Sequence, residues 1–318
     1  MNDISFYLKI KYELINLQVS GKIWGVVIEE IKVKKALNKL HSNFLPYKYD
    51  LNIYRGCSHR CQYCYALYSH KYLETDNFFE KIYIKTNIVE ALEKELSSKR
   101  WKQEWINLGG VTDSYQAIER QYKIMPRILE LLIKYKTPIT ISTKSDLILR
   151  DVDLLEKLAK VTTVNVAVTI TTWDEKIQQK IEPGAISSQK RMEILKQLKG
   201  KGINSGLHLM PIVPYLNSDQ ENLENILREA GKIKVDYVIA GLLNLRSETR
   251  KNFLKFIQEN FPELADKYFR EYKGAYWEKE KRREVYFLVH KLMKKYGLNS
   301  DYEKFRPKEI IREQLRLI

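Results

Sequence analysis

Short apolar runs alternate with helical stretches through the middle of the chain. Most of these runs contain no polar interruption, which is typical of parallel strands that are buried on both faces of a sheet. Each run is followed by a longer stretch with helical spacing, so the pattern predicts repeated β/α units. The candidate strands are Leu51–Tyr54, Trp105–Leu108, Pro138–Ser142, Val164–Ile170, Gly206–Met210 and Asp236–Ala240.

The helical stretches carry apolar residues three or four positions apart, as helices that cover a sheet do. Thr86 precedes the first stretch and is a candidate N-cap. Strands and helices in this order predict an α/β fold, a partial (β/α)6 TIM-type barrel whose active site lies at the carboxyl ends of the strands. The apolar stripes begin at Val89, Ile124, Leu154, Ile194 and Leu223.

The alternation is absent from both ends of the chain. Residues 1–48 contain one predicted strand, Ile23–Ile28, and a basic stretch from Lys32 to Lys39, and we expect them to form an N-terminal extension. Residues 246–318 show only helical spacing and are predicted to form a helical C-terminal region. The core barrel is therefore expected to occupy residues 49–245.

All three cysteines of the chain, Cys57, Cys61 and Cys64, lie in one segment with the spacing C-x3-C-x2-C. A 4Fe–4S cluster held by three thiolates keeps one iron free to bind another molecule. The alternative is a zinc site, for which His59 or His70 would supply a fourth ligand. Zinc ligands usually come as two separated pairs and this chain has no second pair, so the spacing favours the cluster.

The cysteine segment resembles that of the radical S-adenosylmethionine superfamily, in which an aromatic residue, here Tyr63, precedes the last cysteine. The resemblance implies a 4Fe–4S cluster on the three cysteines and S-adenosylmethionine on the free iron, with Tyr63 beside the adenine. From about Phe44 to Leu245 the chain is similar to the spore photoproduct lyase-like, or DNA-repair-photolyase-like, branch. The segments that carry this similarity are Tyr54–Cys57, Gly110–Glu119, Ser142–Ser145, Leu149–Asp151, Thr169–Thr172, Glu182–Pro183 and Pro211–Pro214.

The predicted strand ends offer further contacts for S-adenosylmethionine. Gly109 and Gly110 follow the second strand, where a backbone without Cβ atoms can approach a ligand closely. In the superfamily such a turn contacts the methionine amino group, although the common motif has Glu where this chain has Val111. The resemblance also assigns polar strand-end groups to the ribose and carboxylate of the cofactor. The predicted cofactor-binding residues are Tyr63, Gly109, Gly110, Thr112, Asp113, Ser142, Lys144, Thr169 and Thr171.

Several of these polar residues also have plainer interpretations. Asp113, Tyr115 and Gln116 either line the substrate side or form a hydrogen-bonded turn before a helix. A single lysine after a strand, such as Lys144, is usually a solvated cation. His208 lies within an apolar strand, where a buried core histidine is the usual case, although the barrel interior also allows a catalytic one.

Composition adds an expectation about partners and location. The formal net charge of +15 suits a polyanion such as nucleic acid, although the abundance of lysine is equally typical of a genome-wide bias. No apolar run approaches the roughly 20 residues of a membrane helix, so no membrane association is expected. Clustered free thiols suit the reducing cytoplasm. The family resemblance implies an electron donor such as flavodoxin or ferredoxin.

The resemblance also implies a mechanism, in which the reduced cluster cleaves S-adenosylmethionine and a 5′-deoxyadenosyl radical removes hydrogen from the substrate. The spore enzyme uses an additional cysteine to return a hydrogen atom, whereas here every cysteine is a predicted cluster ligand. Tyr115 is the candidate substitute, so Cys57, Cys61, Cys64 and Tyr115 are the predicted catalytic residues.

Three functions remain as hypotheses. They are a radical enzyme acting on nucleic acid, a radical enzyme acting on a peptide or small metabolite, and a non-catalytic iron–sulfur protein for electron transfer or sensing. The strand-end motifs argue against the third, because a simple electron carrier needs none of them.

Overall fold

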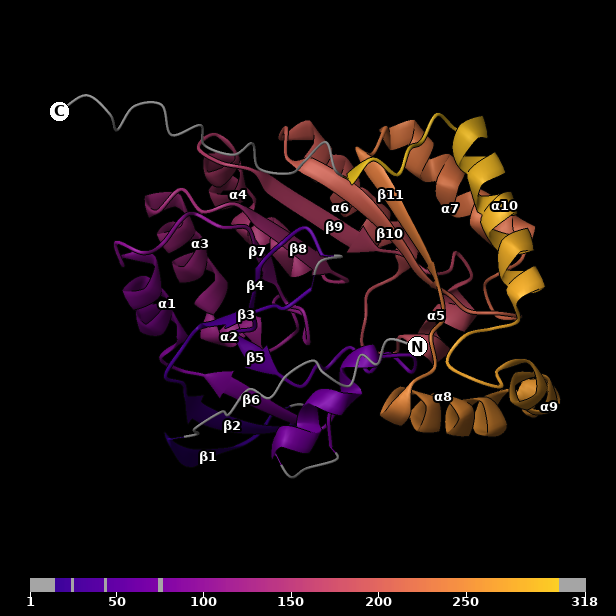
Figure 1. The fold of residues 1–318 in the computed structure, drawn as a ribbon, viewed down its shortest axis with the longest axis horizontal. Helices are drawn as coiled ribbons and strands as arrows, with labels where there is room; N and C mark the ends of the chain where they lie inside the picture. Colours follow the sequence, from indigo (N-terminus) through magenta and orange to yellow (C-terminus); the bar gives the residue numbers. More distant parts are fainter. Residues whose placement is uncertain (1–14, 24–25, 43–44, 74–76, 303–318) are drawn as a thin grey trace.

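The computed structural model describes residues 15–23, 26–42, 45–73 and 77–302. Within these residues the chain forms a seven-stranded and a four-stranded sheet. Figure 1 shows helices wrapped around the outside of the larger sheet, with the smaller sheet below one of its edges. Among the described helices, none combines the length and the apolar character that crossing a membrane would require.

The larger sheet contains the predicted strands in their chain order. Its strands are β3 (Leu37–Lys39), β4 (Tyr49–Leu51), β7 (Ile106–Leu108), β8 (Ile139–Thr143), β9 (Val164–Thr169), β10 (Asn204–Ile212) and β11 (Tyr237–Leu242). From β4 to β11 every neighbouring pair is parallel, and β3 adds an antiparallel strand beside β4. Strands β11 and β3 form the two edges. The prediction of a partial, open (β/α)6 barrel is therefore confirmed.

One predicted strand, Leu51–Tyr54, is divided between the two sheets. Strand β4 ends at Leu51, and β5 (Tyr54–Arg55) pairs with β6 (Lys81–Lys85) in the smaller sheet. The prediction of one continuous strand over Leu51–Tyr54 is therefore wrong. The apolar run hides the break, because Ile53 between the two strands is also fully buried.

The smaller sheet joins the N-terminal segment to the barrel. Strands β1 (Ile15–Ile23) and β2 (Val26–Lys32) are antiparallel, and β2 pairs in parallel with β6. The predicted single strand over Ile23–Ile28 is wrong, because that segment spans the end of β1 and the start of β2. Residues 26–32 thus share a sheet with a strand that follows the cysteines in sequence.

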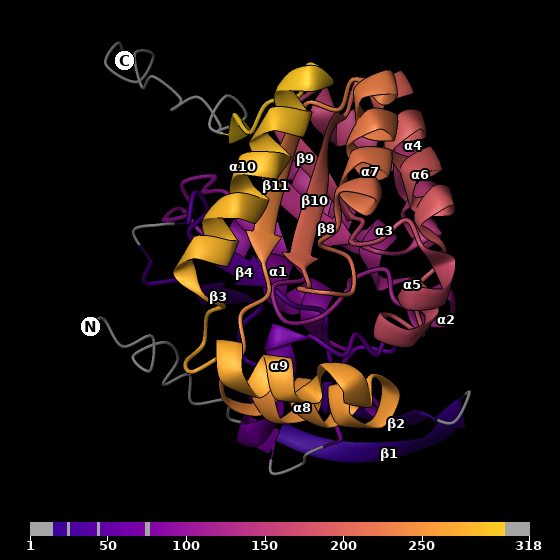
Figure 2. The same cartoon turned by 90° about the vertical axis from the view of Figure 1, so that its right-hand side faces the viewer.

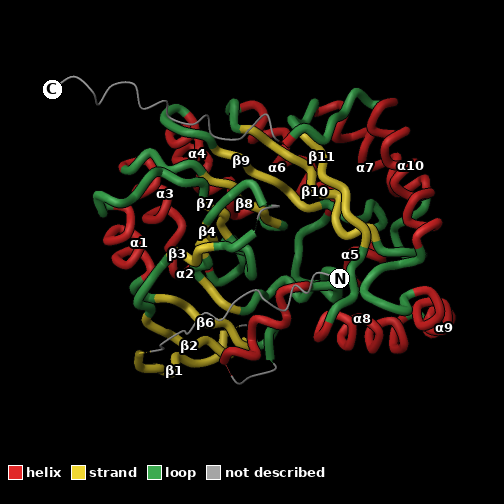
Figure 3. Tube along the Cα trace, viewed as in Figure 1, coloured by secondary structure: helices red, strands yellow, loops and turns green. Residues whose placement is uncertain are grey.

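Helices cover the outer face of the barrel, as Figure 3 shows. The predicted cap at Thr86 is wrong, because the first helix begins at Ile88 and Asn87 occupies its N-cap position. The Asn87 side chain binds the backbone of Val33 instead of its own helix, at 2.8 and 2.9 Å. The helices are α1 (Ile88–Leu96), α2 (Glu119–Tyr122), α3 (Ile124–Lys134), α4 (Val152–Ala159), α5 (Glu175–Ile181), α6 (Ser188–Gly200) and α7 (Gln220–Ile233).

The region after the barrel is helical as far as the structure describes it, as predicted. It contains α8 (Ser247–Asn260), α9 (Pro262–Glu271) and α10 (Lys279–Lys295). In Figure 2 the arrowheads of β10 and β11 point toward α8 and α9, which therefore lie at the carboxyl end of the barrel. Helix α10 packs beside α7, and α8 packs against the 3-10 helix η2 (Tyr65–Leu73).

Aromatic rings fill the amino end of the barrel. Trp105, just before β7, stacks on Tyr302 with ring centroids 5.4 Å apart. Tyr302 also meets Tyr237 of β11 edge to face, at 4.9 Å. These rings connect the middle of the sheet to its edge strand.

A buried carboxylate, Glu119, connects β5, the strand before the cysteines, to the helical layer. It accepts hydrogen bonds from the Tyr54 hydroxyl and, at 2.7 Å, from Arg150 in the 3-10 helix η3 (Asp146–Asp151). It also accepts from the backbone amides of Ile124 and Met125 at 3.1 and 2.9 Å. Those amides begin α3, where a negative charge is favourable.

Glu119→Gln will destabilise the fold, because it leaves Arg150 and the start of α3 facing a neutral amide in a buried site. We expect a loss of about 3 kcal/mol in the free energy of unfolding, as for other broken buried ion pairs. Urea unfolding followed by circular dichroism measures it.

Glu130→Gln on exposed α3 surface is the matched control and should change stability by less than about 0.5 kcal/mol. Equal stability of the two variants would contradict the structural role of Glu119.

Candidate functional site

The cysteine loop, residues 56–65, follows β5 and begins pressed against the smaller sheet. Gly56 has a φ of +80°, and a Cβ atom there would lie 2.4 Å from the carbonyl oxygen of Lys81. Only glycine allows this approach. The amide of Cys57 donates to the carbonyl of Phe78 at 3.3 Å. The position of the first cysteine is thus fixed by the backbone rather than by its own side chain.

The three thiols lie close together in a poorly solvated place. Cys57 and Cys61 are buried and Cys64 is partly exposed. Burial raises the pKa of each thiol, that of Cys61 to about 12, and the neighbouring cysteines raise the pKa values of Cys57 and Cys61 further. Positive charge from bound iron is what would turn such thiols into thiolates. The donor set therefore fits a three-cysteine iron–sulfur cluster.

The zinc alternative fits the geometry less well. His59 is already engaged at both ring nitrogens, with Nε2 2.8 Å from Asp113 Oδ2 and Nδ1 3.0 Å from the Gly184 carbonyl. His70 packs against the rings of Phe78 and Tyr83. Within the described residues, no three His, Cys, Asp or Glu side chains converge on one ion position. A cubane needs no such convergence, because each cysteine binds a different iron.

Asp113 is the hub on one side of the cysteine loop. Its buried carboxylate contacts His59 of the loop and accepts from Thr143 Oγ1 at 3.0 Å and the Lys144 amide at 2.9 Å. It also accepts from the amide of Tyr115 at 2.8 Å. Burial raises its pKa, but His59 and these donors outweigh burial and lower it. An ionised Asp113 thus joins the loop to the end of β8.

The residues beside Asp113 hold the loop backbone. Thr112 donates to the carbonyl of Gly56 at 2.7 Å. Gln116 donates to the same carbonyl at 3.1 Å and accepts from the amide of Ser58 at 2.9 Å. The segment after β7 that contains Thr112 and Gln116 therefore holds the backbone of the cysteine loop in place.

A second segment, residues 181–184, closes on the opposite side of the loop. The amide of Gln62 donates to the Ile181 carbonyl, and the amide of Gly184 donates to the His59 carbonyl, both at 2.9 Å. A Cβ atom at Gly184 would lie 2.1 Å from the carbonyl oxygen of Ser58. The two backbones are in direct contact there, and any side chain would push them apart.

Glu182 in this segment fixes Tyr63. Its fully buried carboxylate accepts from the Tyr63 hydroxyl and from Thr171 Oγ1 at 3.0 Å, and pairs with Arg191 at 2.5 Å. Burial raises the pKa of Glu182, but Arg191 and Lys144 outweigh burial and lower it. Glu182 is therefore an anion that holds the tyrosine ring in place beside the cysteines.

Lys144 and His208 occupy the barrel interior beside the loop. The Lys144 ammonium lies 5.7 Å from the Tyr63 ring centre. Burial lowers its pKa, but Cys61 and Glu182 raise it above the ordinary value, so it is a cation. Burial and Lys144 lower the pKa of His208 to about 4, so its imidazole is neutral at pH 7. Ser142 Oγ lies 3.4 Å from His208 Nδ1.

The glycine turn after β7 faces a carboxylate that the sequence did not single out. Asp50 of β4 accepts from Asn107 at 2.8 Å, and a Cβ atom on Gly110 would lie 2.4 Å from Asp50 Oδ2. Burial raises the pKa of Asp50 to about 6, although the Asn107 hydrogen bond opposes the rise. Val111, which replaces the usual Glu, packs against the apolar cluster around Cys57.

Helix α8 covers the outer side of the loop. Thr249 donates to the carbonyl of Cys64 at 2.9 Å, and Asn252 donates to the carbonyl of Gln62 at 2.7 Å. The helical C-terminal region therefore supports the last cysteine.

The predicted site residues divide into two groups in the structure. Most lie on the cysteine loop, on the glycine turn or at the neighbouring strand ends, and Thr169 is aligned with His208 on the next strand. The polar side-chain atoms of Thr112, Asp113 and Thr171 form hydrogen bonds with other protein groups. In the structure these three residues therefore support the site. The plainer interpretation of Asp113 and Gln116 as a hydrogen-bonded turn is consistent with these contacts.

Tyr115 is enclosed in the core, with no exposed surface. Burial, Asp151 and Glu119 raise its pKa well above the ordinary value. Tyr115 therefore lies near Glu119 and Asp151. Its catalytic role stays a prediction.

Four residues of the site are not predicted as binding or catalytic from the sequence: Asp50, His59, Glu182 and Arg191. The sequence offers His59 only as a zinc ligand, and Glu182 only as part of a motif. Gly184 is a usable signal, since glycine is the default residue where a backbone approaches another group closely. Asp50 gives no local signal, because an acid within a short strand is usually exposed.

Sequence comparisons place the chain among known proteins. A family model described as the radical SAM superfamily matches residues 51–230. An uncharacterised protein of Mycobacterium tuberculosis is 32% identical over 288 residues, covering 89% of this chain and 85% of that protein. An uncharacterised protein of Methanocaldococcus jannaschii is 30% identical over 239 residues, covering 75% and 85%. One from Acidianus two-tailed virus is 28% identical over 251 residues, covering 71% and 81%.

Solved structures show the same fold. A spore photoproduct lyase variant with bound AdoMet and dinucleoside spore photoproduct aligns with a TM-score of 0.62 at 14% identity, covering 83% of this chain and 79% of that chain. SuiB of Streptococcus suis, bound to S-adenosylmethionine, aligns with a TM-score of 0.52 at 15% identity, covering 79% and 49%. The chain is similar to both in architecture.

Gly184→Ala will displace the cysteine loop, because the added methyl group would overlap the Ser58 carbonyl. We expect a loss of about 1–3 kcal/mol in the free energy of unfolding, as for other overpacked sites. Iron bound after anaerobic reconstitution should fall with it. Urea unfolding and an iron assay measure the two effects.

Gly200→Ala is the matched control, because a Cβ atom at this last residue of α6 meets nothing within 4 Å. Helix propensity predicts a neutral or slightly stabilising effect there. A Gly184→Ala protein with normal stability and iron content would contradict the close approach of the two segments.

Proposed function

This chain belongs to the radical SAM superfamily, and we propose that Cys57, Cys61 and Cys64 bind a 4Fe–4S cluster whose free iron takes S-adenosylmethionine. The protein is a radical SAM enzyme, and the proposal concerns the ligands, the cofactor contacts and the substrate. One observation carries it: the chain's three thiols share one loop, which two buried carboxylates and a glycine contact hold in place.

When bound, the cluster and S-adenosylmethionine supply a 5′-deoxyadenosyl radical that takes hydrogen from a substrate. The protein's part is to orient the cofactor and exclude water. Glu182 holds the Tyr63 ring, which the family resemblance places beside the adenine. Lys144 places a cation in the barrel interior, where it would bind the carboxylate of S-adenosylmethionine. Ser142 and Thr169 on the neighbouring strands are the proposed partners of ribose hydroxyls.

Asp50 is the proposed partner of the methionine ammonium group. The family motif has a glutamate at the position of Val111, and here that side chain is apolar and packed. Asp50 brings a carboxylate to the same glycine turn from the neighbouring strand, and Gly110 leaves room for it. One of its oxygens is bound by Asn107 and the other faces the turn.

Nucleic acid is the substrate class that we propose. The net charge of +15 supports a polyanion, and one structure of similar fold holds a dinucleoside lesion. The chain has no cysteine beyond the three proposed ligands to return a hydrogen atom to a product, so a reaction that ends differently from that of the spore enzyme is proposed. A one-electron donor such as flavodoxin or ferredoxin completes the proposed system.

Cys64→Ala will reduce the formation of 5′-deoxyadenosine to background, because the cluster loses one of its three thiolates. The assay is anaerobic incubation of reconstituted protein with dithionite and S-adenosylmethionine, followed by chromatography. Ser58→Ala in the same loop is the control and should retain cleavage, since Ser58 holds the loop through its backbone amide, which the substitution keeps. A wild-type protein that binds iron but never cleaves the cofactor would support the electron-transfer alternative instead.

Binding of S-adenosylmethionine should weaken as pH falls below about 6, because a protonated Asp50 cannot pair with an ammonium group. Asp50→Asn should bind more weakly at pH 7 and lose this pH dependence. Equilibrium dialysis of the reconstituted protein across about pH 5 to 8 measures both effects.

Asp266→Asn on the exposed surface of α9 is the matched control and should keep the wild-type profile. An unchanged profile in Asp50→Asn would show that another group binds the ammonium.

A further inference from the structure

An exposed tyrosine is flanked by two arginines beside the carboxyl end of the barrel. Tyr276 has 50% of its surface exposed. The guanidinium carbons of Arg246 and Arg282 lie 5.4 and 5.3 Å from its ring centre. Arg246 also donates to the Tyr276 hydroxyl at 2.7 Å. These residues, here called the Tyr276 cluster, come from three separate parts of the helical C-terminal region.

The backbone under Tyr276 is firmly anchored, so the ring has a fixed position. Tyr276 forms a β-bridge with Asn244, and the amide of Leu245 donates to the Ala275 carbonyl at 2.8 Å. Arg250 of α8 donates to the carbonyls of Gly274 and Tyr272 at 3.0 and 2.8 Å. A preformed aromatic surface of this kind loses little entropy when a ligand stacks on it.

The cluster lies beside the open side of the barrel. Arg246 comes just after edge strand β11, and Thr249, three residues later, binds the carbonyl of Cys64.

We propose that the Tyr276 cluster binds single-stranded nucleic acid whose backbone crosses the open side of the barrel. This inference rests on the proposed function and adds the surface that holds the substrate. Arg246 and Arg282 contact phosphates, and Tyr276 stacks on a base. The neighbouring nucleotide then reaches the interior that contains Lys144.

The chemistry of the cluster favours nucleic acid over an acidic protein. Planar guanidinium groups bind phosphate in a bidentate manner and stack on aromatic rings. An exposed aromatic ring between cations is the arrangement that single-strand binders use, because every base has a face to stack. A base inside a duplex could not reach a barrel interior without leaving the stack, which favours a single strand.

Fluorescence anisotropy with labelled single-stranded DNA and RNA of about 12 nucleotides tests the proposal. Tyr276→Ala should weaken binding about tenfold, since one stacked base no longer has its platform. The double variant Arg246→Gln, Arg282→Gln should lower the slope of log affinity against log salt by about 0.7 for each phosphate that the protein no longer binds. Circular dichroism and iron content establish that each variant is folded.

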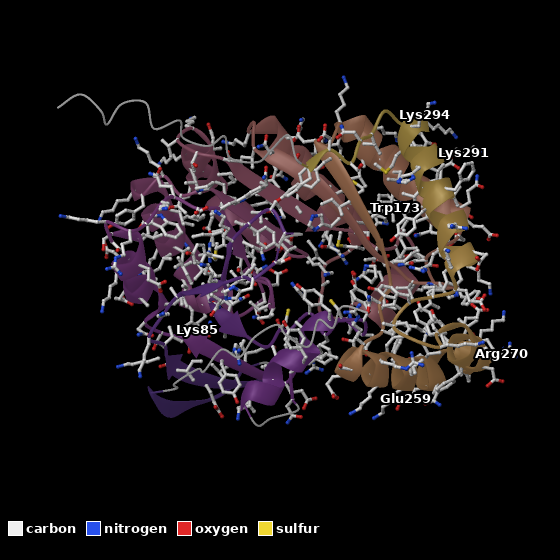
Figure 4. The ribbon with its side chains drawn as sticks, viewed as in Figure 1. Lys85, Trp173, Glu259, Arg270, Lys291 and Lys294 are labelled. Atoms are coloured by element: carbon white, nitrogen blue, oxygen red, sulfur yellow. The ribbon has the colours of Figure 1, made fainter. Side chains whose placement is uncertain are left out.

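Lys291→Gln combined with Lys294→Gln is the matched control, with the same change of charge. These lysines project from the far end of α10, away from α8, as Figure 4 shows. The control should bind like the wild type. Equal losses in control and test variants, tighter binding to the duplex of the same sequence, or no binding at low salt would each overturn the proposal. Cofactor cleavage without DNA or RNA reports the proposed function separately.

Discussion

The cysteine loop has to hold three thiols in a poorly solvated position, and two buried carboxylates make this arrangement stable. Asp113 binds the loop through His59, and Glu182 binds it through Tyr63. Each carboxylate has charged and neutral donors around it, which keeps it ionised despite burial. Buried anions beside a proposed cluster of thiolates would repel it, and Lys144 and Arg191 supply compensating positive charge.

This constraint explains why residues far apart in sequence belong to one site. Asp113 follows β7, Lys144 follows β8, and Glu182 follows β9, and the side chains of all three contact the loop after β5. Parallel strands bring these ends together at one side of the sheet. Helix α8 then covers the outer side, so the C-terminal region contributes to the site and does not merely follow the barrel.

The sequence predicted the barrel because its strands are uninterrupted apolar runs, as with Val164–Ile170. It could not separate Leu51 from Tyr54, since both are fully buried and only their hydrogen-bond partners assign them to different sheets. The cysteine spacing identified the loop because ligand spacing is local. The partners of the loop depend on contacts across more than fifty residues, such as His59 with Asp113, and no local pattern encodes them. Asp50 became visible only when the structure placed it against Gly110.

The central claim is that the cluster has an iron free to bind S-adenosylmethionine directly. Electron paramagnetic resonance of the reduced, reconstituted protein, recorded with and without S-adenosylmethionine, tests this claim most directly. We expect a cluster signal whose g-values shift when the cofactor is added, because the cofactor becomes a ligand of one iron. A cluster signal that is identical with and without saturating S-adenosylmethionine would contradict the claim.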